Sequence, residues 1–455
     1  MPAIITDRFK KELISEIQTD IADSANNYYV GIARSVDWDS SDTAPTPLNT
    51  TREMRNAQLQ AMSVKKVEAN SFVIPRYTWS LGALYSAYND NIAGHPIQSY
   101  YVITDENQVY MVLEQGQNAS GVAVTSTVKP TGTATTPFQT ADGYTWKFLY
   151  SIGALRASQF LAANFMPVTK FDAFDSASNA DHVEQYGIQQ AAVARQITGY
   201  TVVDGGSGFT TVPTLTVVGD GTGAKVDATI SGGEITKARL HDSSGAFTLG
   251  TNYTRAHVTV TGGGGSGAVI RPIFGPPDGL GADPRDDLRA TAIMFQASPD
   301  GDEGSNWVTG NDFRQVMLVK NPNIADSAAS FTATTGNALR RLKFASKSAE
   351  FSADNTMLGA TSGAKAYVVK TDSDEVWYVQ NEDTLFDAFT EGESISETNG
   401  SGAGVLDAGG VDSDTNAFIY PDVNLTTGET LYIDNRAAIT RSTDQSEDVK
   451  IIIQL

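Results

Sequence analysis

Near the start of the chain, apolar residues recur at every fourth position. Over residues 6–22 this spacing places them on one side of a helix, and Thr6 or Asp7 can cap its start. The residues of this stripe are Phe9, Leu13, Ile17 and Ile21. We predict an amphipathic helix that docks on its own domain, and the alternative is a free helix that awaits a partner chain.

A second helix is predicted over residues 51–67, where Thr50 or Thr51 can cap the start. Its apolar positions include Met54, Leu59, Met62 and Val67. Between the two helices, residues 28–34 are typical of a strand because they combine aromatic and β-branched side chains.

From about residue 70 onward, short runs rich in Tyr, Val, Ile and Trp are bounded by polar turns, which is typical of β-strands. The predicted strands are 99–104, 108–114, 144–152, 313–320, 338–345, 364–370, 376–380, 430–434 and 449–455. Residues 116–141 are rich in Gly, Ala, Thr and Pro and indicate a long exposed loop, and a short helix is predicted around 154–164. The last strand, 449–455, is so apolar that we expect it to be buried in a sheet.

Residues 197–274 form a glycine-rich segment that repeats internally. The run that begins at Ile197 aligns with the run that begins at Ile235, with an offset of 38 residues at Phe209 and Phe247. Each run consists of short strands separated by glycine turns. We therefore predict two small β units that stack, share a core and lean on a larger domain.

Together these patterns predict a mainly β fold, a β-rich α+β arrangement with several domains. We expect a β-sandwich-like core with N-terminal helices and two inserted small β modules. The predicted divisions are 1–195 for the first part of the core, 196–275 for the inserted glycine-rich module, 276–349 and 413–455 for the second part of the core, and 350–412 for the second inserted module.

Composition narrows the classes of function. The 455 residues carry a formal net charge of −21, which argues against nucleic acid and anionic membrane surfaces as partners. Cysteine is absent and histidine occurs four times, so thiolate chemistry and histidine-rich metal sites are not expected. No apolar run approaches the roughly 20 residues that span a bilayer, and the first residues are charged where an export signal is apolar.

Two glycine-rich loops invite a phosphate-binding interpretation, and neither fits it well. Residues 219–223 precede a strand-like run rather than a helix, so we predict a β-turn. Residues 359–365 are one residue short of a P-loop and lack the Ser or Thr that follows its lysine.

Acidic clusters are candidates for Ca²⁺ ligands, although none has the spacing of an EF-hand. They are Asp300, Asp302 and Glu303; Asp372, Asp374 and Glu375; and Asp412 and Asp414. We predict solvated acidic turns, and no pair of carboxylates is singled out for glycoside hydrolysis. We assign no catalytic, cofactor-binding or metal-binding residue and expect no cofactor.

Aromatic residues gather in 77–110 and 144–150. They are expected to fill β cores or subunit interfaces, and a sugar-binding platform is the alternative. Arg76 and Arg436 lie in otherwise apolar stretches, where each can be a buried hydrogen-bonding group or an exposed interface residue.

Five segments, in order along the chain, resemble one family, the baseplate wedge protein encoded by gene eight of T4-like contractile-tailed bacteriophages. They are AIITDRFKKE (3–12), VIPRYTWSLGALYSAY (73–88), DGYTWKFLYSI (142–152), FRQVMLVKNP (313–322) and GETLYIDNRAAITRSTDQSEDVKIIIQL (428–455). The segments at 197–274 and about 350–412 have no counterpart in the T4 form. They resemble small β modules of phages that infect cyanobacteria.

The resemblance implies a structural, late-expressed subunit of the virion baseplate that is assembled in the host cytoplasm and supports the conformational change on infection. It implies a homodimer in each of six wedges, which bridges the gene six and gene seven products, with the gene ten and gene fifty-three products as further neighbours. No catalysis, cofactor, nucleic acid or membrane is implied. The alternatives are a tail-associated adhesin that binds host glycans and a glycan-degrading enzyme.

Overall fold

The computed structural model describes residues 3–174, 180–241, 245–409 and 416–455. Strands account for 39% of the chain and helices for 12%, which confirms the prediction of a β-rich, multi-domain fold. The chain divides into two compact units. Unit 1 consists of Met1–Ser15, Ser71–Met294 and Ile452–Leu455, and unit 2 consists of Glu16–Asn70 and Phe295–Ile451.

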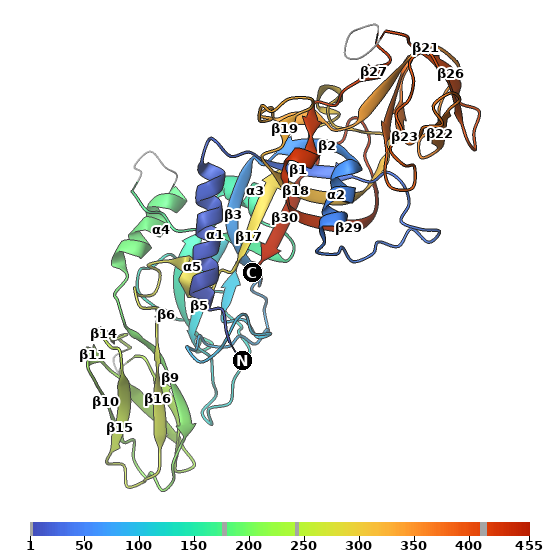
Figure 1. The fold of residues 1–455 in the computed structure, drawn as a ribbon. Helices are drawn as coiled ribbons and strands as arrows, with labels where there is room; N and C mark the ends of the chain where they lie inside the picture. The colour runs from blue at the N-terminus through green and yellow to red at the C-terminus, as the bar shows by residue number, and fades with distance from the viewer. Residues whose placement is uncertain (1–2, 175–179, 242–244, 410–415) are drawn as a thin grey trace. The chain divides into compact units, whose positions relative to one another are not determined.

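The framework of unit 2 is a five-stranded sheet in the order β20-β2-β1-β18-β29, of which β1, β2, β18 and β29 are labelled in Figure 1. Its strands are β1 (Tyr28–Ala33), β2 (Ala61–Lys66), β18 (Asp312–Lys320), β20 (Thr335–Asn337) and β29 (Glu429–Thr440). Strand β18 pairs with β1 on one side, where Tyr28 lies opposite Lys320, and with β29 on the other. Buried side chains from these strands, such as Tyr29, Val64 and Met317, form one apolar cluster.

The second predicted helix is correct at its start and wrong at its end. Helix α2 (Thr51–Leu59) begins after Thr50, whose hydroxyl accepts a hydrogen bond from Glu53 N at 3.2 Å. The chain then enters strand β2, in which Ala61–Val64 are buried. Sheet pairing with β1 overrides the helical spacing because it buries both faces of these residues, which a helical stripe would not.

The rest of unit 2 holds a second sheet that closes on itself. Its order is β24-β23-β22-β25-β26-β21-β27, and β21 also pairs with β24. These strands are β21 (Arg340–Ala349), β22 (Thr356–Gly359), β23 (Lys365–Thr371), β24 (Glu375–Val379), β25 (Ser394–Glu397), β26 (Ala403–Leu406) and β27 (Phe418–Ile419). Because β21 pairs with both β24 and β26, the six strands β21–β26 form a ring without a free edge.

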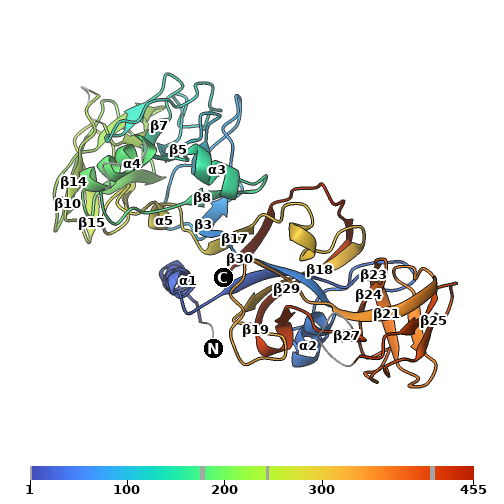
Figure 2. The same ribbon diagram turned by 90° about the horizontal axis from the view of Figure 1, so that it is seen from above.

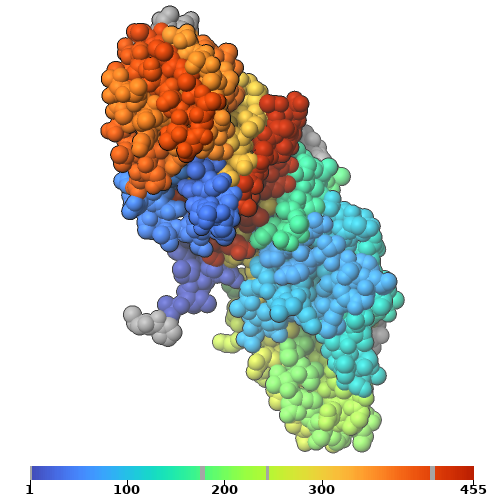
Figure 3. Space-filling view, turned by 90° about the vertical axis from the view of Figure 1, so that its right-hand side faces the viewer, coloured from blue at the N-terminus to red at the C-terminus, as the bar shows by residue number. Residues whose placement is uncertain are grey.

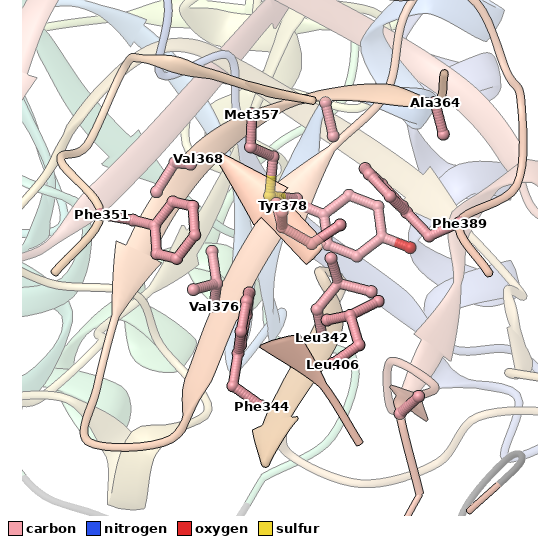
Figure 4. Close-up of a cluster of buried hydrophobic side chains, with 13 residues drawn as sticks. Leu342, Phe344, Phe351, Met357, Ala364, Val368, Val376, Tyr378, Phe389 and Leu406 are labelled. Atoms are coloured by element: carbon pink, nitrogen blue, oxygen red, sulfur yellow. The ribbon is translucent and has the colours of Figure 1, made fainter. Parts of the chain in front are cut away.

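Alternate residues of these strands point into the ring and fill it. Figure 4 shows this cluster, in which Leu342, Met357 and Val368 are fully buried. Strands β21, β23, β24 and β25 lie together in Figure 2. The ring includes β21, so this module extends beyond the predicted 350–412 and takes residues 340–349 from the expected core.

Unit 1 contains a four-stranded sheet in the order β4-β5-β7-β6. The strands are β4 (Tyr101–Ile103), β5 (Gln108–Glu114), β6 (Phe138–Gln139) and β7 (Thr145–Ser151). Its core includes Tyr110, Trp146 and Phe148, and Ile188 of helix α4 (Ala180–Ala191) packs against them. Residues 115–137 contain no strand, which agrees with most of the predicted loop at 116–141, but the short strand β6 lies within the last part of that range.

A second four-stranded sheet has the order β30-β17-β3-β8, and three of its strands contain residues of both units. The strands are β3 (Ala69–Pro75), β8 (Phe165–Val168), β17 (Ala292–Ala297) and β30 (Val449–Gln454). The last strand therefore lies in a sheet as predicted, but it occupies an edge. Only Ile451 is buried, and Ile452 and Ile453 are half-buried.

The remaining elements are short apart from the first helix. They are α1 (Asp7–Ala22), α3 (Ala154–Phe160), α5 (Pro284–Asp287), β19 (Asn323–Ile324), β28 (Val423–Asn424) and the 3₁₀ turns η1 (Glu303–Ser305) and η2 (Leu425–Thr427). Strand β19 pairs with β28. The predicted helix at 154–164 corresponds to α3, which ends at Phe160.

The glycine-rich module of unit 1 pairs its two halves crosswise. The first half holds β9 (Ile197–Asp204), β10 (Thr214–Gly219), β11 (Thr222–Ala224) and β12 (Asp227–Ser231), and the second holds β13 (Glu234–Arg239), β14 (Leu249–Thr251), β15 (Ala256–Thr261) and β16 (Val269–Phe274). The pairs are β9–β16, β10–β15, β11–β14 and β12–β13, and the strands of the first three pairs are labelled in Figure 1. The prediction of a shared core is confirmed, whereas that of two stacked units is wrong, because every pair joins one half to the other.

Glycine permits this crosswise pairing where two loops meet. Gly206 has a φ of +66°, and a Cβ added there would lie 2.5 Å from the Ser266 carbonyl oxygen. No side chain fits in that space, and L-residues disfavour that backbone conformation. Phe209 and Ile235, one from each half, are buried together beneath these loops.

The closed ring of unit 2 yields a test of the fold. Leu342→Ala removes a fully buried side chain from β21 and is expected to lower the free energy of unfolding by about 2–5 kcal/mol. Val405→Ala on the neighbouring strand β26 is the control, because Val405 is 39% exposed. Peptide-resolved hydrogen exchange should show faster exchange across β21–β26 in the first variant only. Equal exchange in both variants would contradict the assigned interior.

Candidate functional site

The loop at residues 219–223 is a structural turn between β10 and β11, as predicted. Asp220 accepts hydrogen bonds from the Thr254 hydroxyl, from Thr254 N at 2.9 Å and from Arg255 N at 3.1 Å, and these bonds hold the pKa of its carboxyl well below the ordinary value. A Cβ added at Gly221 would meet the ring of Tyr253. The loop is thus occupied by the protein's own groups, and the strand β11 that follows provides no helix N-terminus for a phosphate.

The loop at residues 359–365 is wrapped around a carboxylate of the chain itself. Glu393 accepts hydrogen bonds from the amides of Thr361 and Ser362, each at 2.9 Å, and from Ser362 Oγ at 2.7 Å. Burial alone would raise the pKa of Glu393, but the bonds from Ser362, Thr390 and Thr361 outweigh it and lower the pKa. Lys365 begins strand β23, so this segment is a β-turn and not a P-loop.

The first acidic cluster is tied into hydrogen bonds and an ion pair. Glu303 forms an ion pair with Lys65 at 2.7 Å and also accepts a bond from Asp300 N at 2.8 Å. Asp300 Oδ1 in turn accepts from Ser446 Oγ at 2.5 Å. Asp302 caps the turn η1. These carboxylates hold the loop together rather than converging on one point.

The second acidic cluster lies beside β24 and is partly neutralised. Glu375 pairs with Arg341 at 3.0 Å, and Asp374 pairs with Lys343 at 3.8 Å. Asp412 and Asp414, the third cluster, lie outside the described residues. Within the described ranges, no three acidic or histidine side chains gather closely enough to hold a metal ion.

The aromatic clusters belong to the core of unit 1. Tyr110, Tyr144, Trp146 and Phe148 are all fully buried. Tyr144 stacks on Trp146 with a centroid distance of 5.6 Å, and Tyr110 meets Phe148 edge to face at 5.5 Å. The core interpretation is confirmed for these residues, which present no exposed platform to a sugar.

The two arginines singled out by sequence have different roles. Arg76 is half-buried and donates from Nη1 to the Ala162 carbonyl at 3.1 Å, so it is an intramolecular hydrogen-bonding residue. The Arg436 side chain is 52% exposed and pairs with Asp434 at 2.7 Å. Sequence alone left both alternatives open for each residue.

The buried face of helix α1 differs from the predicted one. Lys11 and Ile14 are its buried residues, whereas Phe9 and Leu13 are 54% and 41% exposed. Lys11 is held by Asp286 at 2.6 Å and Asp283 at 3.4 Å, both beside or within α5. This ion-pair network draws a lysine inward, and the predicted apolar stripe is left facing solvent at its N-terminal end.

The exposed part of that stripe continues into the residues before the helix. Ile4 is 85% exposed and Ile5 is 61% exposed. We call Ile4, Ile5, Phe9 and Leu13 the N-terminal apolar surface. Exposed apolar groups spaced by four along one helix face are typical of a protein–protein contact.

A polar cleft of about 620 Å³ lies in unit 1, between the glycine-rich module and the segment around β5. Figure 3 shows the two surfaces side by side, the module in yellow-green and the segment in cyan. Lys237 Nζ donates to the Gln117 carbonyl at 2.6 Å, and Thr236 Oγ1 donates to the Ala119 carbonyl at 3.2 Å. These bonds dock strand β13 on the loop after β5.

Two charged side chains in this cleft influence each other. Burial, followed by the neighbouring positive charge of Arg239, lowers the pKa of Lys237. Glu114 accepts from Leu240 N at 2.6 Å and from Thr145 Oγ1 at 2.8 Å. Sequence reasoning missed this cleft because its walls lie more than 100 positions apart in the chain, as the 120 positions between Gln117 and Lys237 show.

No protein-family model matches the chain, and no curated protein matches it. Among the helices in the described parts of the chain, none has both the length and the apolar character needed to cross a membrane.

The carboxylate-filled loop yields a prediction. Glu393→Gln is expected to speed hydrogen exchange at the Thr361 and Ser362 amides by about tenfold or more, because bonds to a charged acceptor contribute about 1.5–3 kcal/mol. Glu391→Gln, at an exposed position, is the matched control.

The same loop should respond to acid. The pKa of Glu393 is lower in the folded chain than its ordinary value of 4.5, so its stabilising effect is complete above that value and is lost as the pH falls through the lowered pKa. Exchange at these two amides, corrected for its intrinsic pH dependence, should therefore be protected at pH 6 and lose protection at strongly acid pH. Equal protection at the two pH values would contradict the role of the carboxylate. Equal protection in Glu393→Gln and Glu391→Gln at pH 6 would contradict it as well.

Proposed function

We propose that the chain is a structural subunit of the baseplate wedge of a contractile-tailed phage. In this role it joins neighbouring wedge proteins during baseplate assembly and supports the rearrangement of the baseplate on infection. The proposal rests on the resemblance described above together with the placement of the resembling segments in the fold.

The observation that carries the proposal is that these segments coincide with framework elements. Residues 142–152 contain β7, residues 313–322 contain most of β18, and residues 428–455 contain β29 and β30. The glycine-rich module and the ring of β21–β26 instead have sheets and apolar clusters of their own. This arrangement is expected of a shared framework to which two modules have been added.

The N-terminal apolar surface supports an assembly role. An apolar helix face left in solvent is unfavourable for a lone subunit and becomes favourable when a partner covers it. The net charge of −21 keeps free subunits apart and steers partners with basic patches toward the chain. We propose as partners a second copy of the chain and proteins of the gene six, gene seven, gene ten and gene fifty-three types.

The location in the particle can be tested by counting. Quantitative mass spectrometry of tailed particles from the source of this chain, and of baseplates released from them, should find it in both. Its copy number per baseplate is expected to be a multiple of six. Absence from baseplates, or presence only in detachable fibres, would contradict the wedge role and favour the adhesin alternative.

The N-terminal apolar surface can be tested by mutation. The double variant Phe9→Ser, Leu13→Ser is expected to keep its free energy of unfolding within about 0.5 kcal/mol, because both side chains are exposed. Its incorporation into baseplates should fall about tenfold or more, which corresponds to about 1.4 kcal/mol of lost contact energy. Val212→Ser, at a position 58% exposed in the glycine-rich module, is the control. Incorporation equal to that of the control would contradict the surface's role.

A further inference from the structure

The polar cleft between the glycine-rich module and the core of unit 1 has the features of a ligand site. Its volume of about 620 Å³ lies within the range of small-molecule sites in proteins. Strands β9 and β13 of the module form one wall, and residues 84–89 together with the chain after β5 form the other. Both walls belong to one compact unit.

The charges of the cleft set it apart from the chain as a whole. Its charged lining residues are Glu114, Lys237 and Arg239. The carboxylate of Glu114 is satisfied by Leu240 N and Thr145 Oγ1, and the ammonium of Lys237 donates to a backbone carbonyl. The Arg239 guanidinium has no hydrogen bond or ion pair to any residue that the structure describes. The cleft thus has one excess positive charge and a guanidinium without a partner among the described residues, and in a chain of net charge −21 this favours an anionic ligand.

The uncharged residues that line the cleft indicate the chemical class of the ligand that carries the anionic group. Five residues with side-chain amides line the cleft, and they are Asn89, Gln98, Gln115, Gln117 and Gln139. Part of their hydrogen-bonding capacity is used within the chain, since Gln115 Nε2 donates to the Tyr85 carbonyl at 2.7 Å and Gln98 Oε1 accepts from Ser86 Oγ at 3.4 Å. Hydroxyls of Ser86, Ser120, Thr201 and Thr236 lie among them. Amides both donate and accept, so they match ligands with many hydroxyl groups. Gln98 and Gln139 are exposed and can reach a bound chain without rearrangement of the core.

A peptide strand fits the cleft less well. Strand β13 pairs with β12 along one edge, and the side chains of Lys237 and Thr236 are bonded to the loop after β5, which leaves less of the strand accessible for peptide addition. The apolar lining side chains are mostly small or buried, such as Ala87, Ala123 and Leu113, and they form no deep pocket for a large apolar residue.

We propose that this cleft binds an acidic saccharide, with Arg239 pairing with a sugar carboxylate and the surrounding amides bonding its hydroxyls. The site does not depend on the wedge role. It also requires the module and the core together, so residues 197–274 alone would lack one of its walls.

Isothermal titration of the full chain with tetragalacturonate tests the proposal. We expect binding, and we expect Arg239→Gln to weaken it about tenfold or more because one charge-assisted pair is lost. Gln98→Ala, at an exposed position, should weaken it less. Arg271→Gln is the matched control, since Arg271 is an exposed arginine of the same module outside the cleft lining, and it should bind like the unchanged chain.

Three further probes decide between ligand classes. Maltotetraose, which is neutral, should bind at least tenfold more weakly than tetragalacturonate. Equal binding of the two would overturn the acidic assignment. Binding of tetraglutamate in place of tetragalacturonate would overturn the saccharide and indicate an acidic peptide. Absence of tetragalacturonate binding, or binding that Arg271→Gln reduces as much as Arg239→Gln does, would overturn the proposal.

Discussion

The antiparallel pairing of β1 with β18 is the interaction on which the rest of unit 2 depends. It joins parts of the chain that are far apart, as the bond from Asn27 N to Asn321 Oδ1 shows across 294 positions. Strand β18 is buried over seven consecutive residues and also pairs with β29, so the start, the middle and the end of the chain meet in one sheet. The entropic cost of closing a loop rises only slowly with the length of the loop. Long chain segments between these strands therefore add little to the free-energy cost of forming the sheet.

Much of the secondary structure could be predicted because local patterns decide it. Strands such as β5 and β23 are short β-branched and aromatic runs between polar turns, and their bounds agree with the prediction to within about one residue. Helix α1 was located correctly, but its buried face was not. The stripe through Phe9 and Leu13 has the right spacing, yet the ion pairs of Lys11 with the segment around α5 decide which side turns inward. Partners so distant in sequence leave no periodic signal.

The sequence could exclude candidate binding sites, but it could not locate the sites that the structure shows. Local sequence sufficed to argue against phosphate binding at residues 219–223, because a strand-like run follows them, and at residues 359–365, because they are one residue short of a P-loop and lack its Ser or Thr. The placement of Glu393 in the second loop depends on the pairing of β22 with β25, which brings together residues 31 positions apart in the chain. The polar cleft likewise arises from the docking of β13 on the loop after β5. No single segment of the sequence contains enough residues of the Glu393 loop or of the polar cleft to predict either one.

The crosswise pairing of the glycine-rich module has a consequence for how such proteins diversify. Ile197, where the module begins, lies opposite Phe274, where it ends, so the chain leaves and re-enters unit 1 at adjacent positions. Among the described residues, its strands pair only with one another. Because these two positions are neighbours in space, removal or exchange of the whole module would leave only a short gap between the flanking parts of unit 1. Either half alone is not a transferable unit, because every strand pair needs a member from each half.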